Sequence, residues 1–165
     1  MSIAGVEPVM DELRAQFQTY LPAKITALQP TFTPVLPMPA PKAYVFGERE
    51  VFFEGLPVLQ LLARPSTVRN EDLRWQDHMH VIDVAVFIGD VDQENVQRLL
   101  FRYARCVLET FAERRKAGAF TLDLTLRSRE IDYSPLAQLR EAQFVRAVFI
   151  PVAASRRGSG GLELH

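Results

Sequence analysis

The residue types best suited to metal binding or acid–base chemistry cluster once in this chain, where Asp77, His78 and His80 lie close together. Side chains two positions apart on a β-strand share a face, so the two histidines form a pair able to ligate a metal ion. A structural site needs two further ligands, and no spacing in the sequence marks them. Asp83 falls on the face opposite to His80 if the strand is regular. We therefore favour solvent-facing or hydrogen-bonded histidines over a metal site.

Other signatures of enzyme chemistry are missing from the sequence. It contains no phosphate-binding glycine loop, no Gly-x-Ser-x-Gly and no Cys/His pattern. Asp123 and Asp132 lie outside any catalytic motif, and spacing alone does not reveal paired carboxylates. Cys106 is the single cysteine, and its place beside an apolar helical stripe favours a buried thiol over a nucleophile. We expect no catalytic residues, no bound metal, no cofactor and no enzyme activity.

The composition is that of one globular domain. The chain has 165 residues, of which 48% are hydrophobic and 24% charged, and its formal net charge is −1. That length and apolar content suffice for one core. A chain so nearly neutral has no general attraction to nucleic acid or to an anionic membrane. With no apolar run of membrane-spanning length and no signal peptide, we expect a soluble protein made in a cytoplasm.

A strand–helix–strand unit at residues 80–127 is the clearest structural pattern. Residues 80–88 are rich in β-branched side chains and predict a strand whose even-numbered positions share one face. Residues 95–111 repeat apolar side chains every three or four positions, which predicts a helix with one buried stripe. Arg98, Arg102, Arg105 and Glu109 fall largely off that stripe, so their side chains can stay in water. Asp90 or Asp92 can cap this helix, which we expect to end at residues 116–118. Alternating leucines predict a strand at residues 121–127.

The flanking segments predict simpler elements. Residues 4–20 are amphipathic and predict a helix, with a kinked continuation to Leu28 as the alternative because Pro22 interrupts the backbone hydrogen bonding. Five prolines make residues 30–42 an extended connector. Residues 43–56 are expected to form an irregular, extended β arm. We further predict a strand at 57–65, a bend or bulge near Asp77, a last strand at 144–152 and a flexible tail at 154–165.

Together these segments predict an α+β fold. We expect a mixed or antiparallel sheet of about four to five strands with two helices on one face, plus the extended arm. Residues 1–153 are expected to form one domain.

The order of these elements and several short phrases resemble the tail terminator, or tail-completion, proteins of long-tailed bacteriophages. Two of these short sequences are at the start of the first strand, at His80, and in the helix, at residues 102–105 (Arg-Tyr-Ala-Arg). The other two are at the end of a strand, at residues 130–135, and at the start of the last strand, at Arg146. The resemblance spans roughly residues 43–153. The proline-rich connector and the glycine-rich tail are features that the family does not predict.

The resemblance implies a structural virion protein without enzyme activity. Members are small α+β proteins that form a hexameric ring, cap the tail tube and present a surface to the head connector. For this chain it implies self-association, contacts with the tail tube protein and with a head-completion protein, and DNA that only passes through the lumen. Its place would be the tail or neck of a virion, assembled in the host cytoplasm, with no membrane contact. A different neck or head-closure factor, and a small ligand-binding protein or enzyme, remain alternatives.

Four aromatic residues in the expected arm are our candidates for the ring interface. A lone subunit would have difficulty burying them all, and exposed apolar patches commonly mark interfaces. The equally weighted alternative is that they fold back on the core. These residues are Tyr44, Phe46, Phe52 and Phe53.

Overall fold

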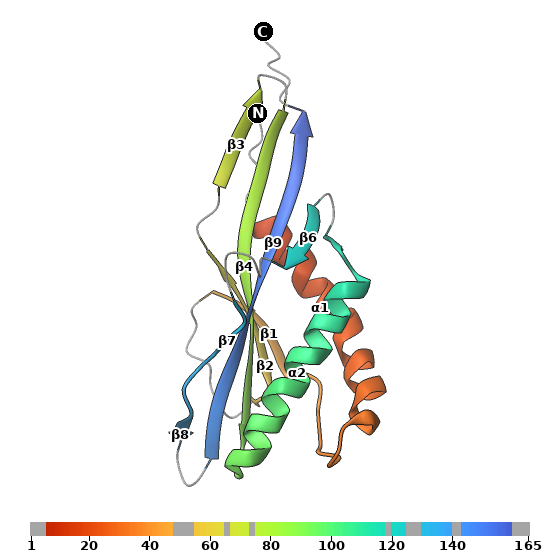
Figure 1. Cartoon of the computed structure of the whole chain (residues 1–165), viewed down its shortest axis with the longest axis vertical. Helices are drawn as coiled ribbons and strands as arrows, with labels where there is room; N and C mark the ends of the chain where they lie inside the picture. Colours follow the sequence, from red (N-terminus) through yellow and green to blue (C-terminus); the bar gives the residue numbers. More distant parts are fainter. Residues whose placement is uncertain are drawn as a thin grey trace.

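The computed structural model describes residues 6–47, 55–64, 67–72, 75–117, 120–124, 130–139 and 143–159. The fold is α+β, with two helices on one face of a mixed sheet, as predicted (Figure 1). The described part of that sheet has nine strands, more than the four to five we expected. Most of the additional strands are short and pair with one of two long central strands.

The centre of the sheet is a long antiparallel pair of strands, β4 (Trp75–Asp90) and β9 (Gln143–Ser159). Their register runs unbroken from Trp75 opposite Ser159 to Asp90 opposite Phe144. The bend or bulge expected near Asp77 is therefore absent from this pair. Residues 154–159, expected to belong to the flexible tail, are instead part of β9, and residues 160–165 lie outside the described residues. Each of these strands supplies hydrogen-bond partners for the backbone N–H and C=O groups of the other, and this pairing stabilises unusually long strands.

The remaining strands line both sides of this pair. On the β4 side, β2 (Val58–Ala63) and β3 (Thr67–Asp72) pair antiparallel with β4, and β1 (Ala43–Phe46) pairs parallel with β2. On the β9 side, β6 (Phe120–Leu124), β7 (Asp132–Tyr133) and β8 (Ala137–Leu139) each pair with β9. A two-residue strand, β5 (Lys116–Ala117), pairs with β6 at the far edge.

The helices cover the even-numbered face of β4 and β9. The register places Ile82 opposite Val152, Val84 opposite Ile150, and Val86 opposite Val148. All six of these side chains are buried in the core beneath α1 (Val6–Leu28) and α2 (Gln93–Glu113). The shared face predicted for residues 82–88 is confirmed, because alternate side chains of a strand point to the same side. No helix in the described part of the chain is long and apolar enough to cross a membrane.

Helix α1 ends at Leu28, as the alternative prediction had it, whereas α2 ends earlier than predicted. Helix α1 continues through Pro22 to Leu28, because buried Leu21 and Ile25 extend its apolar stripe and outweigh the backbone hydrogen bond that proline cannot donate. Helix α2 ends at Glu113 rather than at residues 116–118, since Lys116 and Ala117 pair in β5. Of the two acids proposed as its cap, Asp92 accepts hydrogen bonds from the backbone amides of Glu94 (2.8 Å) and Asn95 (3.1 Å).

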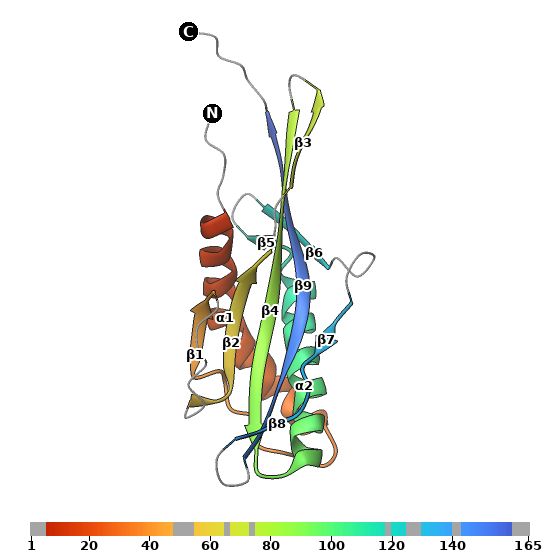
Figure 2. The same cartoon turned by 90° about the vertical axis from the view of Figure 1, so that its left-hand side faces the viewer.

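A three-stranded arm projects beyond the helices. It consists of β3 with the outer ends of β4 and β9, and Figure 1 shows both helices confined to the other part of the molecule. The arm therefore contains residues 67–72, 75–79 and 155–159. Of the arm predicted at residues 43–56, residues 48–54 lie outside the described part of the chain. Residues 43–46 form β1, at the edge of the helix-covered part of the sheet (Figure 2).

The proline-rich connector joins α1 to β1. After a short 3₁₀ turn at Gln29–Thr31 it runs without regular structure to Lys42. Met38 is buried in the core, and the Tyr103 hydroxyl of α2 donates a 2.6 Å hydrogen bond to the carbonyl of Pro39. The connector, which follows α1 in the chain, therefore also packs against α2.

Substitution of Asp92 by alanine should lower the free energy of unfolding by about 1 kcal/mol, because two amides of the first helical turn lose their acceptor. Asparagine retains a side-chain oxygen, so Asp92→Asn should change stability much less. Urea denaturation of both variants measures the difference. Equal losses in the two variants would contradict a capping role.

Candidate functional site

The predicted interface residues Tyr44 and Phe46 lie on β1 and are half-buried against the core. The guanidinium of Arg14, on α1, lies 4.1 Å from the centre of the Phe46 ring. The Tyr44 hydroxyl oxygen is buried and has no hydrogen-bond partner among the described residues, and burial raises the pKa of Tyr44. Phe52 and Phe53 lie outside the described residues. The described half of the set therefore folds back on the body of the protein rather than onto the projecting arm.

The members of the predicted histidine cluster do not form one site. His80 lies beneath the helices, with its ring centre 5.7 Å from that of Phe120. Asp83 is buried on the opposite face of β4, as predicted, and its carboxylate accepts a 2.7 Å hydrogen bond from Nε of Arg64. His78 belongs to β4, in a part where the structure describes only the backbone. Within the described residues, no three His, Cys, Asp or Glu side chains group closely enough to hold a metal ion.

Cys106 is fully buried on α2, as its position predicted. Burial, together with the negative charge of Glu109, raises the pKa of its thiol to about 11. The thiolate is the reactive form of cysteine, so this side chain is poorly suited to nucleophilic chemistry at neutral pH.

A hollow that the sequence did not reveal lies between α2 and the start of the connector. Its volume is about 440 Å³. Three arginines from successive turns of α2 line one side, and residues of the 3₁₀ turn and the connector line the other. The complete lining is Thr31, Phe32, Thr33, Arg98, Phe101, Arg102 and Arg105.

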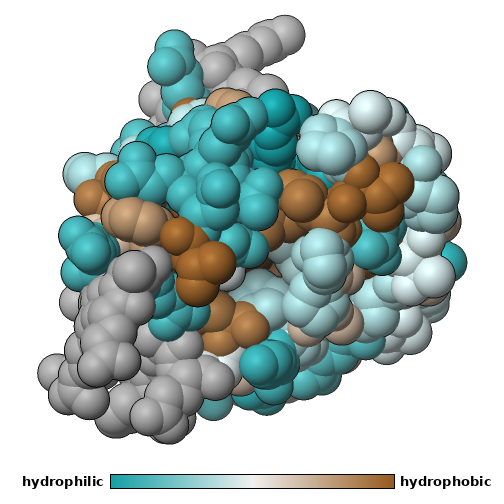
Figure 3. Space-filling view, turned by 90° about the horizontal axis from the view of Figure 1, so that it is seen from below, coloured by the Kyte–Doolittle hydropathy of each residue, from teal (hydrophilic) through white to brown (hydrophobic). Residues whose placement is uncertain are grey.

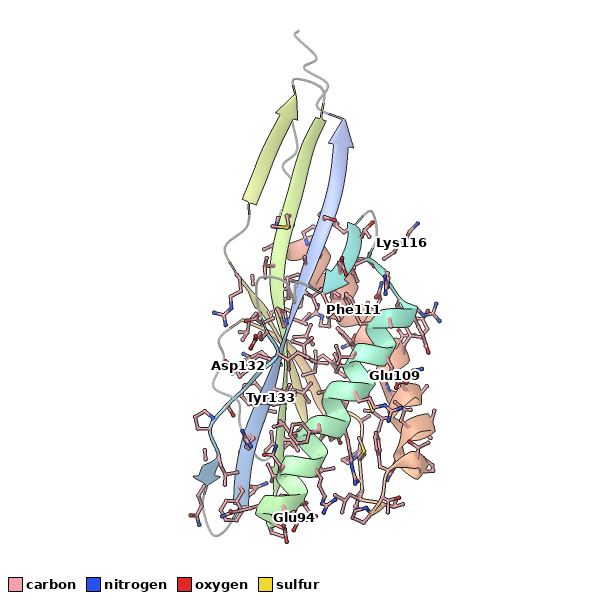
Figure 4. The ribbon with its side chains drawn as sticks, viewed as in Figure 1. Glu94, Glu109, Phe111, Lys116, Asp132 and Tyr133 are labelled. Carbon is pink, nitrogen blue, oxygen red and sulfur yellow. The ribbon has the colours of Figure 1, made fainter. Side chains whose placement is uncertain are left out.

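Two of the three arginines are paired with acids on their own helix. Arg98 Nη2 lies 2.5 Å from Glu94 Oε1, and Arg105 Nε lies 2.8 Å from Glu109 Oε1. Figure 4 labels both glutamates, one near the start of α2 and the other further along it. The pairs are at the surface and have the four-residue spacing that favours contact along a helix.

Arg102 has no such acid. Only 6% of this residue is exposed, and its guanidinium carbon lies 5.1 Å from the centre of the Phe32 ring. Its Nη1 atom is buried, and no residue in the described part of the chain accepts a hydrogen bond from it. Burial lowers the pKa of Arg102, and the neighbouring charge of Arg98 lowers it further. An arginine nonetheless stays charged, so this part of the fold holds a buried cation that the helix itself does not neutralise.

The prediction that Arg102 can stay in water is therefore wrong. Its position on α2 is off the main apolar stripe, but the connector passes over that flank of the helix and covers it. The sequence signal was limited to the spacing of the three arginines, which cannot show what lies against them.

An exposed aromatic pair borders this hollow, because one of its members, Phe101, belongs to the lining. Phe101 is 50% exposed and Tyr133, on β7, is 36% exposed; their rings meet edge to face with centres 5.5 Å apart. Figure 4 labels Tyr133 beside the sheet. Arg146 holds the adjoining segment by donating a 2.9 Å hydrogen bond from Nε to the carbonyl of Ser134. Exposed, ordered aromatic side chains of this kind are common in protein contacts.

Further apolar side chains are exposed at the end where β4 passes into α2. Val91, between β4 and α2, is 74% exposed, and Leu136, between β7 and β8, is 41% exposed. Figure 3 views the molecule from below, towards this end, and shows separate apolar areas divided by hydrophilic ones. The surface is therefore mixed, as in contacts between proteins that also exist apart.

Comparison with known proteins adds little to these observations. No family model matches the chain, and no curated protein matches it. One solved structure is similar over 87% of this chain and 94% of its own, with 15% sequence identity and a TM-score of 0.42. The name of that protein states no function.

Substitution of Tyr44 by phenylalanine should raise the free energy of unfolding of the monomer by about 1 kcal/mol, because it removes a buried hydroxyl that has no partner. Chemical denaturation at low protein concentration measures this. A clear loss of stability would show instead that the hydroxyl is hydrogen-bonded in solution.

Substitution of Arg102 by methionine should also stabilise the isolated protein, by about 1 to 2 kcal/mol, because it replaces an unpaired buried cation with an apolar side chain of similar reach. The matched control is Arg105→Met, on the same helix and wall of the hollow. Arg105 is exposed and ion-paired, so its loss should change stability by less than about 0.5 kcal/mol. A destabilised Arg102→Met variant would mean that the guanidinium contributes to the fold.

Proposed function

We propose that this chain is the subunit of an oligomeric ring that closes the tail tube of a long-tailed bacteriophage or a related particle. In this role it is a tail terminator, which joins the tail to the head connector through contacts with the tube protein and a head-completion protein. The ring assembles in the host cytoplasm, resides in the neck of the virion and lets DNA pass through its lumen. The resemblance of element order and short phrases described above supports this proposal.

The observation that carries the proposal is the projecting arm. Neither helix covers β3 or the outer ends of β4 and β9 (Figure 1). A small sheet without a layer packed on it gains little from burial, so the arm is best stabilised by a neighbouring subunit. A closed ring built from one repeated contact needs two different complementary surfaces on each subunit. The arm provides one of them, and the body of the next subunit provides the other.

The edges of the arm favour such a contact. In the described residues β3 pairs only with β4, and the pairing of β9 with β6 ends at Ser155. Residues 156–159 of β9 pair with β4 on one side and have no described strand on the other. An unpaired strand edge offers backbone donors and acceptors to another chain.

The arginine-lined hollow supports a second candidate, a small ligand-binding protein. A volume of about 440 Å³ is within the range of small-molecule sites. Such a protein needs no ring, so the oligomeric state distinguishes the two functions.

The first test is the native mass by light scattering after size exclusion, measured over a range of protein concentrations. The terminator proposal predicts a species of about six subunits at high concentration, in accordance with a closed cyclic contact. If the isolated chain is monomeric, the measurement is repeated with the tail tube that it is expected to cap. A chain that remains monomeric under both conditions would overturn the proposal.

Two truncations test the arm itself. A chain ending at Ala154 loses the part of β9 that belongs to the arm, and we expect it to fold but fail to assemble. A chain ending at Ser159 keeps all of β9 and should assemble normally. Circular dichroism and thermal unfolding establish that both bodies are folded. Normal rings from the shorter chain would show that the arm is not the contact.

A further inference from the structure

The hollow beside α2 has an excess of one positive charge. Glu94 compensates Arg98, and Glu109 compensates Arg105. For Arg102 the described residues provide no acidic partner, and its Nη1 is buried without any hydrogen-bond partner. Leaving a guanidinium buried and unpaired is costly, so its presence there indicates a group that arrives from outside the subunit.

The orientation of Arg102 leaves its hydrogen-bonding capacity available. Its cationic group lies against the Phe32 ring, 5.1 Å from the ring centre, and Arg105 approaches the same ring at 5.7 Å. A contact with an aromatic ring uses the charge of a guanidinium but none of its N–H donors. These donors match the two oxygens of a carboxylate or two oxygens of a phosphate.

The charge and the lining distinguish between these anions. A carboxylate carries one negative charge and neutralises the excess, whereas a phosphate monoester carries about 1.5 to 2 and would exceed it. The hollow, at about 440 Å³, is also larger than a bare ion requires. Phe32 and Phe101 form apolar parts of its lining, which suits a ligand with an apolar body next to the acid.

We propose that this hollow is a binding site for a carboxylate attached to a planar or branched apolar group, with Arg102 as its principal partner. The carboxylate belongs either to a small organic acid or to an acidic side chain of a protein segment, and the chemistry of recognition is the same for both. The site does not depend on the proposed ring, because all its described lining comes from one subunit.

The test is a titration of the folded full-length chain followed by ¹H–¹⁵N NMR, with benzoate as the probe. Benzoate should shift the backbone amides of Thr33, Phe101 and Arg105 and the Nε–H of Arg102 in a saturable manner. Benzamide has the same shape without the charge and should bind at least tenfold more weakly. Inorganic phosphate should also bind more weakly than benzoate.

Two variants assign the effect to Arg102. Arg102→Met should weaken benzoate binding at least tenfold. The matched control is Arg14→Met, because Arg14 also lies over an aromatic ring, 4.1 Å from the centre of Phe46, but it is paired with an acid, Asp11, and is not part of the lining of the hollow. Its removal should leave benzoate affinity unchanged. A capped dipeptide of phenylalanine and glutamate tests the second source, and tighter binding than benzoate would assign the acid to a protein segment.

Three results would overturn the inference. They are equal binding of benzoate and benzamide, undiminished benzoate binding by a folded Arg102→Met variant, and shifts that map away from the hollow. Tighter binding of phosphate than of benzoate would overturn the assignment to a carboxylate. Native mass is recorded in the same samples, so failure of this site and failure of the ring proposal are distinguished.

Discussion

The pairing of β4 with β9 is the constraint on which the rest of the structure depends. β4 is 16 residues long and β9 pairs with it along its whole length. Every other strand is attached to this pair directly or through one neighbour. A shift of one residue would turn Ile82, Val84 and Val86 away from the helices, so the apolar alternation of both strands holds the register. One end of the pair is therefore buried in the core beneath the helices, and the other end projects beyond them as part of the arm.

The core end explains why α1 and the connector lie where they do. Leu21 and Ile25 are buried beyond Pro22, which keeps α1 helical long enough to reach the end of the molecule where the connector begins. The connector returns along α2, with Met38 buried and Pro39 hydrogen-bonded to Tyr103. Because it crosses the flank of α2, it encloses Arg102 beside Phe32. The hollow is thus a product of two segments far apart in the sequence.

The arm and the hollow have different physical characters. The arm offers backbone hydrogen-bonding groups along strand edges, which favour assembly with another chain and impose little chemical selectivity. The hollow offers one unneutralised guanidinium with aromatic surroundings, which selects a ligand by its charge and shape. A subunit that assembles through the first feature can still recognise an acidic group through the second. The buried, unpaired Arg102 lowers the stability of the isolated fold. Proteins often retain such destabilising residues at functional sites.

The sequence by itself determined the class of fold and the faces of its main elements. The β-branched alternation at residues 82–88 and the helical spacing at residues 95–111 depend on local geometry alone, and both elements appear as predicted. The burial of Cys106 and the opposite placement of Asp83 and His80 follow from the same periodicities.

Only the tertiary structure decided where the arm projects, how far β9 extends and which arginine is buried. Residues 155–159 have the composition of a linker, yet they form a strand because β4 supplies their hydrogen bonds. Tyr44 and Phe46 belong to a segment whose sequence predicted an exposed arm. In the structure, pairing with β2 and contact with α1 keep them against the helix-covered part of the protein. Arg98, Arg102 and Arg105 are equivalent by spacing, and only the passage of the connector makes Arg102 different. Each of these outcomes depends on a partner distant in the sequence, which local patterns do not contain.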